Sequence, residues 1–204
     1  MRIFIVLVTI LLFSSCGEGK KTLKFETPFQ EKMNTEFKDA SLSPLKPKDL
    51  KNFESLDFFP YDSTFVVTAT LKRTPDTEWF DMKTTTDRLS KERVFGIVSF
   101  ELKGQTFQLN TYQGKELSQS EGSEDYLFLP FLDHTNGTST YKGGRYIDLE
   151  IPEGNTIEID FNSAYNPYCA YDEKYSCPIV PMENYVALEI KAGVKAFVSA
   201  YEKE

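Results

Sequence analysis

The chain has 204 residues, a net charge of −8 and a hydrophobic fraction of 40%, which together predict one globular domain with a buried core. The acidic balance excludes nucleic acid as a partner, because nucleic-acid binding requires clustered lysine and arginine. One histidine and three cysteines exclude a zinc protease with a histidine pair and a four-cysteine zinc site. The aromatic fraction of 14% favours a β-rich fold.

The N-terminus has the features of an export signal. Met1 and Arg2 precede an apolar run, 3–13, in which only Thr9 is polar. As a helix this run would be about 16 Å long, roughly half the thickness of the hydrocarbon core of a bilayer. The length therefore predicts a signal peptide and not a transmembrane helix.

The junction after this run predicts a lipid anchor. Residues 13–16, Phe-Ser-Ser-Cys, resemble the lipobox of bacterial lipoproteins. Several acyl chains on Cys16 would anchor the protein stably to a membrane of the cell envelope, on its periplasmic or cell-surface face. We expect a signal peptide over 1–15, a lipidated tether over 16–26 and a single β-rich domain over 27–204. An ordinary secretory signal followed by a free cysteine is the alternative.

The first folded element is predicted to be a short helix. Thr27 has the chemistry of an N-cap, Pro28 suits the first helical position, and Gln30 completes a capping box. An apolar residue then recurs every four positions from Phe29, and the helix is expected to end near Ala40.

Later segments show the alternation of a half-buried sheet. Strands are predicted over 65–71, 126–132 and 185–191, with a weaker one over 79–84. The clearest local prediction is a hairpin over 94–112 with a two-residue Lys103-Gly104 turn. Its expected pairs are Leu102 with Gln105, Phe100 with Phe107, and Val98 with Leu109. The fold class predicted is mainly β, a single antiparallel β-sandwich or open barrel with a short N-terminal helix.

A second hairpin is predicted over 145–161. The register that keeps the apolar residues of both strands on one face pairs 151 with 157, 149 with 159 and 147 with 161. It also places Asp148 opposite Asp160 and Glu150 opposite Glu158, and like charges opposite each other destabilise a sheet. Three explanations are open: a solvated face with lysine or arginine nearby, a bound Ca²⁺, or a carboxylate that its neighbour keeps protonated.

The loop before this hairpin is a candidate binding site. It carries Asp133, His134 and Tyr141, and it ends at Arg145, which could bind an anion with two hydrogen bonds. His134 is the only imidazole of the chain, so any histidine general base must be this residue. The alternative is a tight loop whose Asp and Thr side chains cap its own backbone.

Downstream, asparagines and tyrosines alternate with rigid prolines, as in an ordered loop. Cys169 and Cys177 follow, separated by seven residues. In an exported protein this spacing predicts a disulfide, which would stabilise the fold by roughly 2–3 kcal/mol on the loop-entropy model. A metal site formed with His134 or a carboxylate is the alternative, although the spacing matches no standard zinc pattern.

The stretch 128–192 resembles the bacterial domain of unknown function 1684. The matching motifs are Phe128-Leu129-Pro130-Phe131, Thr140-Tyr141-Lys142-Gly143-Gly144-Arg145-Tyr146, Asp160-Phe161-Asn162, Ala164-Tyr165-Asn166-Pro167 and Cys177-Pro178, with Ser43-Pro44-Leu45 and Phe59-Pro60 upstream. Tyr185 and Val194 depart from the family pattern, which tends to carry arginine and glutamate there. The resemblance implies a β-rich domain with a clustered polar surface, and it implies no reaction.

Two functions follow as expectations. The first is a non-enzymatic envelope lipoprotein whose polar cleft binds a small ligand, a glycan or a cation, with no cofactor other than Ca²⁺. The second is a carboxylate- or metal-dependent hydrolase of the cell envelope that uses Asp148 and Asp160, or His134. The single histidine and the lack of a nucleophile motif favour the binding module. The expected ligand-binding residues are Asp133, His134, Tyr141, Arg145, Asp148, Asp160, Asn162, Tyr165 and Asn166.

Overall fold

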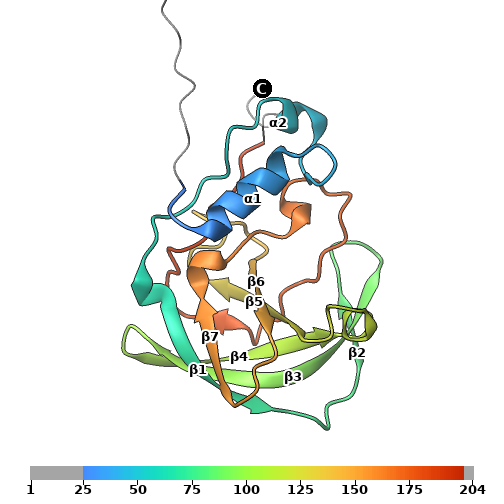
Figure 1. Ribbon diagram of the computed structural model, residues 1–204, viewed down its shortest axis with the longest axis vertical. Coiled ribbons are helices and arrows are strands. Elements are labelled where there is room, and N and C mark those ends of the chain that lie inside the picture. The colour runs from blue at the N-terminus through green and yellow to red at the C-terminus, as the bar shows by residue number, and fades with distance from the viewer. Residues whose placement is uncertain (1–24, 200–204) are drawn as a thin grey trace, which may run out of the picture.

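The computed structural model describes residues 25–199 (Figure 1). The predicted signal peptide, Cys16 and nearly all of the predicted tether lie outside the described residues, so the lipoprotein assignment stays a prediction. Within 25–199, no helix has the length and apolar character needed to cross a bilayer.

One curled sheet forms the body of the protein. Its strands are β1 (Val66–Arg73), β2 (Phe80–Lys83), β3 (Leu89–Leu102), β4 (Gln105–Gly114), β5 (Tyr126–Asp133), β6 (Arg145–Glu150), β7 (Thr156–Asp160) and β8 (Tyr185–Val186). The order along the sheet is β6-β5-β4-β3-β1-β7, with β2 paired to β3 and β8 paired to β5. The β5–β8 pair is parallel and the other pairs are antiparallel.

The helices cover one end of this sheet (Figure 1). They are α1 (Pro28–Lys38) and α2 (Pro47–Lys51), and single 3₁₀ turns occur at η1 (Ser63–Phe65), η2 (Leu117–Gln119), η3 (Phe161–Ser163) and η4 (Tyr168–Ala170). The mainly β class with an N-terminal helix is confirmed. Of the two architectures predicted, the protein adopts the open one, a half-barrel.

Helix α1 begins where the capping residues predict. The Thr27 hydroxyl accepts a hydrogen bond from the Gln30 N–H at 3.2 Å, and Pro28 is the first helical residue. The Gln30 side chain accepts from the Glu26 N–H at 2.9 Å, one residue earlier than in a standard capping box. The apolar stripe of α1 is buried against the C-terminal part of the chain in a cluster separate from the sheet core.

The β3–β4 hairpin forms with the predicted register. Lys103 and Gly104 have φ values of 51° and 75°, which is the left-handed pair required by a two-residue type I′ turn. All three predicted cross-strand pairs are present. The predicted strand over 185–191 is shorter than expected, because only Tyr185–Val186 pairs with a neighbour.

The predicted hairpin over 145–161 is wrong. Strand β6 pairs with β5 and strand β7 pairs with β1, at opposite ends of the strand order. Asp148 therefore lies opposite Phe128, and Asp160 lies opposite Val66. The alternation of apolar and polar residues correctly predicts which face of each strand is buried, but it does not predict which other strand it pairs with. The stacked carboxylate pairs do not form, which removes the reason for expecting Ca²⁺ or a shared proton there.

The two faces of the sheet bury different side chains. Leu127 and Leu129 of β5 belong to the main apolar core. Phe128, between them, points to the other face and packs with Tyr112 and Tyr146 in a second, aromatic cluster. This second cluster borders the candidate site.

Candidate functional site

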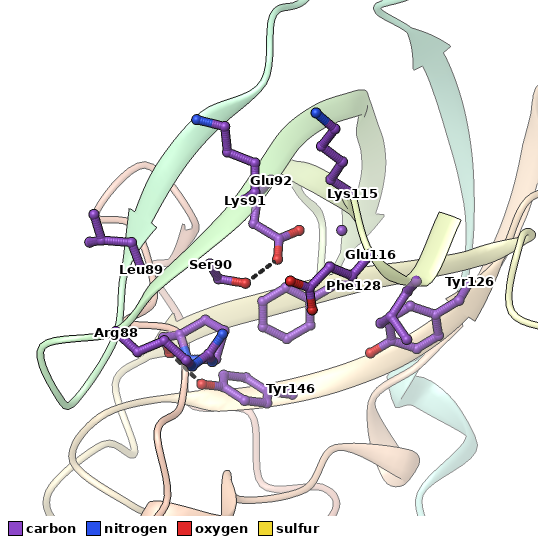
Figure 2. Close-up of a pocket in the computed structure, with 13 residues that line it drawn as sticks. Arg88, Leu89, Ser90, Lys91, Glu92, Lys115, Glu116, Tyr126, Phe128 and Tyr146 are labelled. Atoms are coloured by element: carbon purple, nitrogen blue, oxygen red, sulfur yellow. Dashed lines mark hydrogen bonds between the residues drawn. The ribbon is translucent and has the colours of Figure 1, made fainter. Parts of the chain in front are cut away.

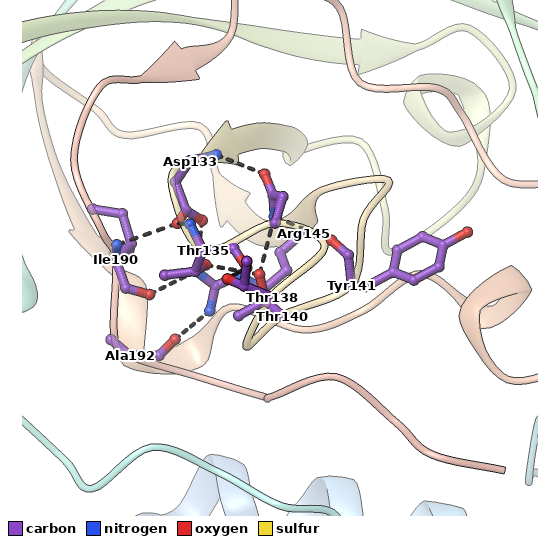
Figure 3. A network of polar contacts seen from close by, with 9 residues as sticks. Asp133, Thr135, Thr138, Thr140, Tyr141, Arg145, Ile190 and Ala192 are labelled. Carbon is purple, nitrogen blue, oxygen red and sulfur yellow. Dashed lines mark hydrogen bonds and ion pairs between the residues drawn. The ribbon is translucent and has the colours of Figure 1, made fainter.

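The loop predicted as a binding site is a buried structural network (Figure 3). Arg145 is 0% exposed. Its guanidinium donates to the Asp133 carboxylate at 2.8 Å, to the Ile190 carbonyl at 2.8 Å and to the Ala192 carbonyl. Asp133 also accepts from the Thr135 N–H at 2.7 Å. Arg145 thus ties the loop to the C-terminal segment, and burial prevents the anion binding that we expected of it.

Three further predicted residues also join backbone segments. Asp160 caps η3 by accepting from the Asn162 N–H at 2.8 Å. The Asn162 amide donates to the Asp62 carbonyl at 3.0 Å and accepts from the Asp62 N–H at 3.0 Å. Asn166 is fully buried and donates to the Lys195 carbonyl at 2.8 Å. These contacts fix the positions of distant loops and are unavailable to a ligand.

His134 lies apart from the other predicted residues. Its side chain is exposed, and its ring centroid is 5.7 Å from that of Tyr185. The adjacent Asp133 points into the buried network instead (Figure 3). The structure therefore does not bring His134 together with Asp148 or Asp160.

A groove beside α1 is the best candidate for a binding site. Its larger part, which we call the outer compartment, has a volume of about 690 Å³. A smaller inner compartment of about 350 Å³ adjoins it, because Leu117, Tyr146 and Pro178 line both. Besides Tyr146, the aromatic and acidic side chains of the outer compartment are Phe29, Glu36, Asp148, Tyr165, Tyr168 and Tyr175. Two predicted residues, Asp148 and Tyr165, therefore do lie in a common site.

Two tyrosine hydroxyls hold Asp148 at the edge of the groove. Its Oδ1 accepts from the Tyr126 hydroxyl at 2.8 Å and from the Tyr165 hydroxyl at 2.6 Å. Burial, reinforced by the charge of Asp148, raises the pKa of Tyr126 and of Tyr165 well above their usual range. Both hydroxyls therefore remain protonated donors and keep the carboxylate oriented.

Tyr146 separates the two compartments. Its hydroxyl donates to the Pro178 carbonyl. Its ring lies edge-on to Phe128 and Tyr165, with centroid distances of 4.6 and 5.9 Å. These contacts give the wall between the compartments a single orientation.

Glu92 is the buried acid of the inner compartment (Figure 2). It is 6% exposed. Its Oε1 accepts from the Ser90 hydroxyl at 2.7 Å, whereas Oε2 is buried without a hydrogen-bond partner among the described residues. Burial raises the pKa of Glu92, and the negative charge of Glu116 adds to this effect. The hydrogen bond from Ser90 and the charge of Arg88 oppose it.

Cys169 and Cys177 are neighbours next to the outer compartment. The Cys169 N–H donates to Cys177 Sγ at 3.2 Å, and the Tyr141 hydroxyl is 3.9 Å from Cys169 Sγ. Both cysteines are free thiols in this structure, so the disulfide stays a prediction. A hydrogen bond from Cys177 lowers the pKa of Cys169 to about 6. Within 25–199, no three or more His, Cys, Asp or Glu side chains are arranged to hold a metal ion.

The sequence analysis missed Glu92, Tyr126 and Tyr146. Tyr146 and Tyr126 alternate with core residues in their strands, and alternation normally assigns such positions to solvent. The even-numbered positions of β3 include Glu92 and the buried residues 98, 100 and 102, so an acid in this phase was the one available signal. A register shift between Val94 and Gly96 places Glu92 on the opposite face of the sheet from those three residues, which sequence alternation does not show.

The fold and the groove define a class of protein: an open antiparallel half-barrel with one main helix beside a tyrosine-lined groove. The chain belongs to the family described as protein of unknown function DUF1684, which matches residues 51–195. A solution NMR structure of an uncharacterised protein from Haloarcula marismortui is 32% identical to it, with a TM-score of 0.65. That similarity covers 81% of this chain and 89% of the other. No curated protein matches the chain.

Proposed function

We propose that this protein is an exported envelope lipoprotein that binds a small organic ligand in the groove. The observation that carries the proposal is the convergence of aromatic rings and carboxylates on two adjoining compartments of about 690 and 350 Å³. Pockets for small molecules have volumes of about 300–1,000 Å³ and combine apolar walls with a few polar groups. The groove has this size and composition.

The outer compartment suits a ligand with an apolar ring face and polar substituents, such as a sugar. Tyr168 is 40% exposed and lies edge-on to Tyr175 at a centroid distance of 5.3 Å. These rings provide a surface on which the ligand can stack. Asp148 lines the same space and can accept hydrogen bonds from hydroxyl or amine donors of the ligand.

The proposed location follows from the N-terminal sequence. The apolar run over 3–13 and the lipobox-like end at Cys16 support export and lipidation. Helix α1 begins at Pro28, soon after the predicted tether, and its Phe29 and Met33 line the outer compartment. A lipid on Cys16 would thus hold the groove close to the membrane surface.

A binding screen tests the proposal. The chain with Cys16→Ser, which carries no lipid, is titrated with monosaccharides, disaccharides and small aromatic compounds while amide shifts are followed by NMR. We expect shifts at groove residues, and Tyr168→Ala should lower the affinity about three- to tenfold, the loss expected for one aromatic contact. Tyr61→Ala is the control, because Tyr61 is exposed and lies outside the groove lining. Equal weakening by both variants, or shifts confined to other surfaces, would contradict the proposal.

The hydrolase alternative has less support. Asp160 caps η3 and lines neither compartment of the groove, whereas Asp148 lines the outer one, so the two carboxylates do not face a common cavity. His134 is outside the lining of both compartments. Asp148 remains as the one predicted catalytic carboxylate in the groove.

A further inference from the structure

We propose that the inner compartment binds the cationic group of the ligand, a primary or quaternary organic ammonium. This inference rests on the proposed function, because it names the ligand class for the same groove. Its basis is the juxtaposition of the Glu92 carboxylate with the rings of Phe128, Tyr126 and Tyr146 (Figure 2).

One carboxylate oxygen of Glu92 is buried and lacks a hydrogen-bond donor among the described residues. A buried carboxylate oxygen without a donor carries a desolvation penalty that its hydrogen bonds do not offset. Oε2 is in this position among the described residues, while Oε1 accepts from Ser90. Glu92 lines an adjoining cavity, so a donor or a positive charge entering that cavity would supply the missing partner.

A glycine leaves space beside the Glu92 carboxylate. Gly114 is the cross-strand neighbour of Glu92. A Cβ atom at Gly114 would lie 3.4 Å from both carboxylate oxygens. Gly114 is not among the glycines with positive φ, so its backbone conformation does not require glycine. The missing side chain instead leaves room at the acid.

The charged side chains around the inner compartment bear on the sign of the ligand's charge. Three basic residues border the compartment. Lys91 pairs with Asp81 at 2.9 Å, whereas Arg88 donates to two neutral oxygens of Ser176 at 2.9 and 3.0 Å and keeps its charge beside the cavity. The ammonium groups of Lys91 and Lys115 point away from the aromatic rings in Figure 2. Arg88 and Lys115 thus balance the charges of Glu92 and Glu116, and the preference for a cation rests on Glu92 Oε2, a carboxylate oxygen that lacks a donor among the described residues.

Aromatic rings form walls of the inner compartment. The ring of Phe128 lies edge-on to Tyr146 at 4.6 Å, and Tyr126 closes the opposite side of the compartment (Figure 2). Aromatic faces attract ammonium groups through the ring quadrupole, and protein sites for quaternary ammonium ligands use several such rings. A neutral hydroxyl would gain much less from these walls.

The experiment compares three probes of similar shape: benzylamine, benzyltrimethylammonium and neutral benzyl alcohol. Each is titrated at pH 7.5 into the Cys16→Ser chain, with amide shifts at Glu92 and Gly114 as the readout. We expect both cations to bind at least tenfold more tightly than the alcohol. Glu92→Gln, which keeps the shape and removes the charge, should abolish this preference. Glu101→Gln is the matched control, since Glu101 is an exposed acid of the same strand.

A second variant keeps the test independent of the charge change. Gly114→Ala leaves Glu92 intact and fills the space beside it, so it should also weaken binding of the cations. Equal affinities for amine and alcohol, or a preference that survives Glu92→Gln, would overturn the inference. Shifts confined to Tyr168 and Tyr175 without preference for a cation would overturn it and leave the proposed function standing. If no compound of either panel shifts groove residues, both proposals fail.

Discussion

Arg145 and Glu92 are both almost completely buried, and they differ in their partners. Arg145 donates to Asp133 and to two carbonyls, so its charge is compensated inside the protein. Among residues 25–199, Glu92 has one donor, Ser90, and one oxygen without a partner. Arg145 also leaves its Nε without a hydrogen-bond partner among the described residues, but its charge is paired with Asp133 and it lines neither compartment of the groove. The unpaired oxygen of Glu92 belongs to a residue that lines a cavity, so a ligand there could supply the missing contact.

The raised pKa of Glu92 predicts a pH-dependent effect on stability. Its carboxyl faces Ser90 and Arg88 from its own segment and Glu116 from beyond β4, and burial is the largest influence. Because the pKa is higher in the folded state, the ionised form destabilises the fold. This cost is complete above the folded-state pKa, decreases as the pH falls through it, and is gone below the pKa of the unfolded chain. We expect Glu92→Gln to raise the melting temperature at pH 7.5, by roughly 2–4 °C for each kcal/mol gained.

Melting curves between pH 4 and pH 8 measure this effect. The gain in melting temperature from Glu92→Gln should shrink as the pH falls, because wild-type Glu92 then becomes neutral too. Glu101→Gln, on an exposed side chain of β3, should show no such trend. A variant that is less stable than wild type at pH 7.5 would mean that the charge of Glu92 is already stabilised inside the folded protein.

Of the two predicted hairpins, the one over 94–112 is confirmed and the one over 145–161 is wrong, and the difference has a physical reason. The β3–β4 turn at Lys103-Gly104 joins its strands directly, so local backbone geometry sets the register. Strands β6 and β7 follow each other with a short loop but pair with β5 and β1. Their partners depend on the packing of the whole sheet, which alternation within one segment does not report.

The buried Asp133–Arg145 ion pair connects the β5–β6 loop to the C-terminal segment, so its loss should destabilise the fold. Asp133→Ala would leave Arg145 buried without its carboxylate and would also remove the acceptor for the Thr135 and Ile190 N–H groups. Removing one partner of a buried ion pair typically costs about 3–5 kcal/mol. We expect a loss of this size in the free energy of unfolding, measured by urea denaturation.

The control for this change is Glu189→Ala. Glu189 forms an ion pair with Lys191 at 2.7 Å in which both side chains are more than half exposed, and exposed pairs contribute about 0–1 kcal/mol. If the two variants lose similar stability, the Asp133–Arg145 pair does not have the buried structural role described above.

At the scale of the whole molecule, the groove is assembled from segments far apart in the chain. Phe29 comes from α1, Glu92 from β3, Tyr146 from β6 and Tyr175 from the segment after η4. None of these residues is close to another in sequence. Their meeting depends on the curl of the sheet and on the position of α1 over its end (Figure 1).

The N-terminal sequence predicts where the whole molecule resides. Cys16→Ser removes the thiol that would carry the lipid, so the protein should move from the membrane fraction to the soluble fraction, or its signal should remain uncleaved. Fractionation and gel mobility of the variant and the wild type measure this outcome. Cys169→Ser is the control, because Cys169 lies in the folded domain. Unchanged fractionation and mobility of the Cys16 variant would contradict the lipoprotein assignment.

The sequence by itself was sufficient for features that depend on residues near one another in the chain. These are the mainly β class, the start of α1 at Thr27-Pro28, the β3–β4 register and the motifs of the family. Only the tertiary structure decided the partners of β6 and β7, the burial of Arg145, and the meeting of Asp148 with Tyr126 and Tyr165. The reason is that local backbone preferences act over a few residues, whereas burial and strand partnership result from the packing of the entire chain.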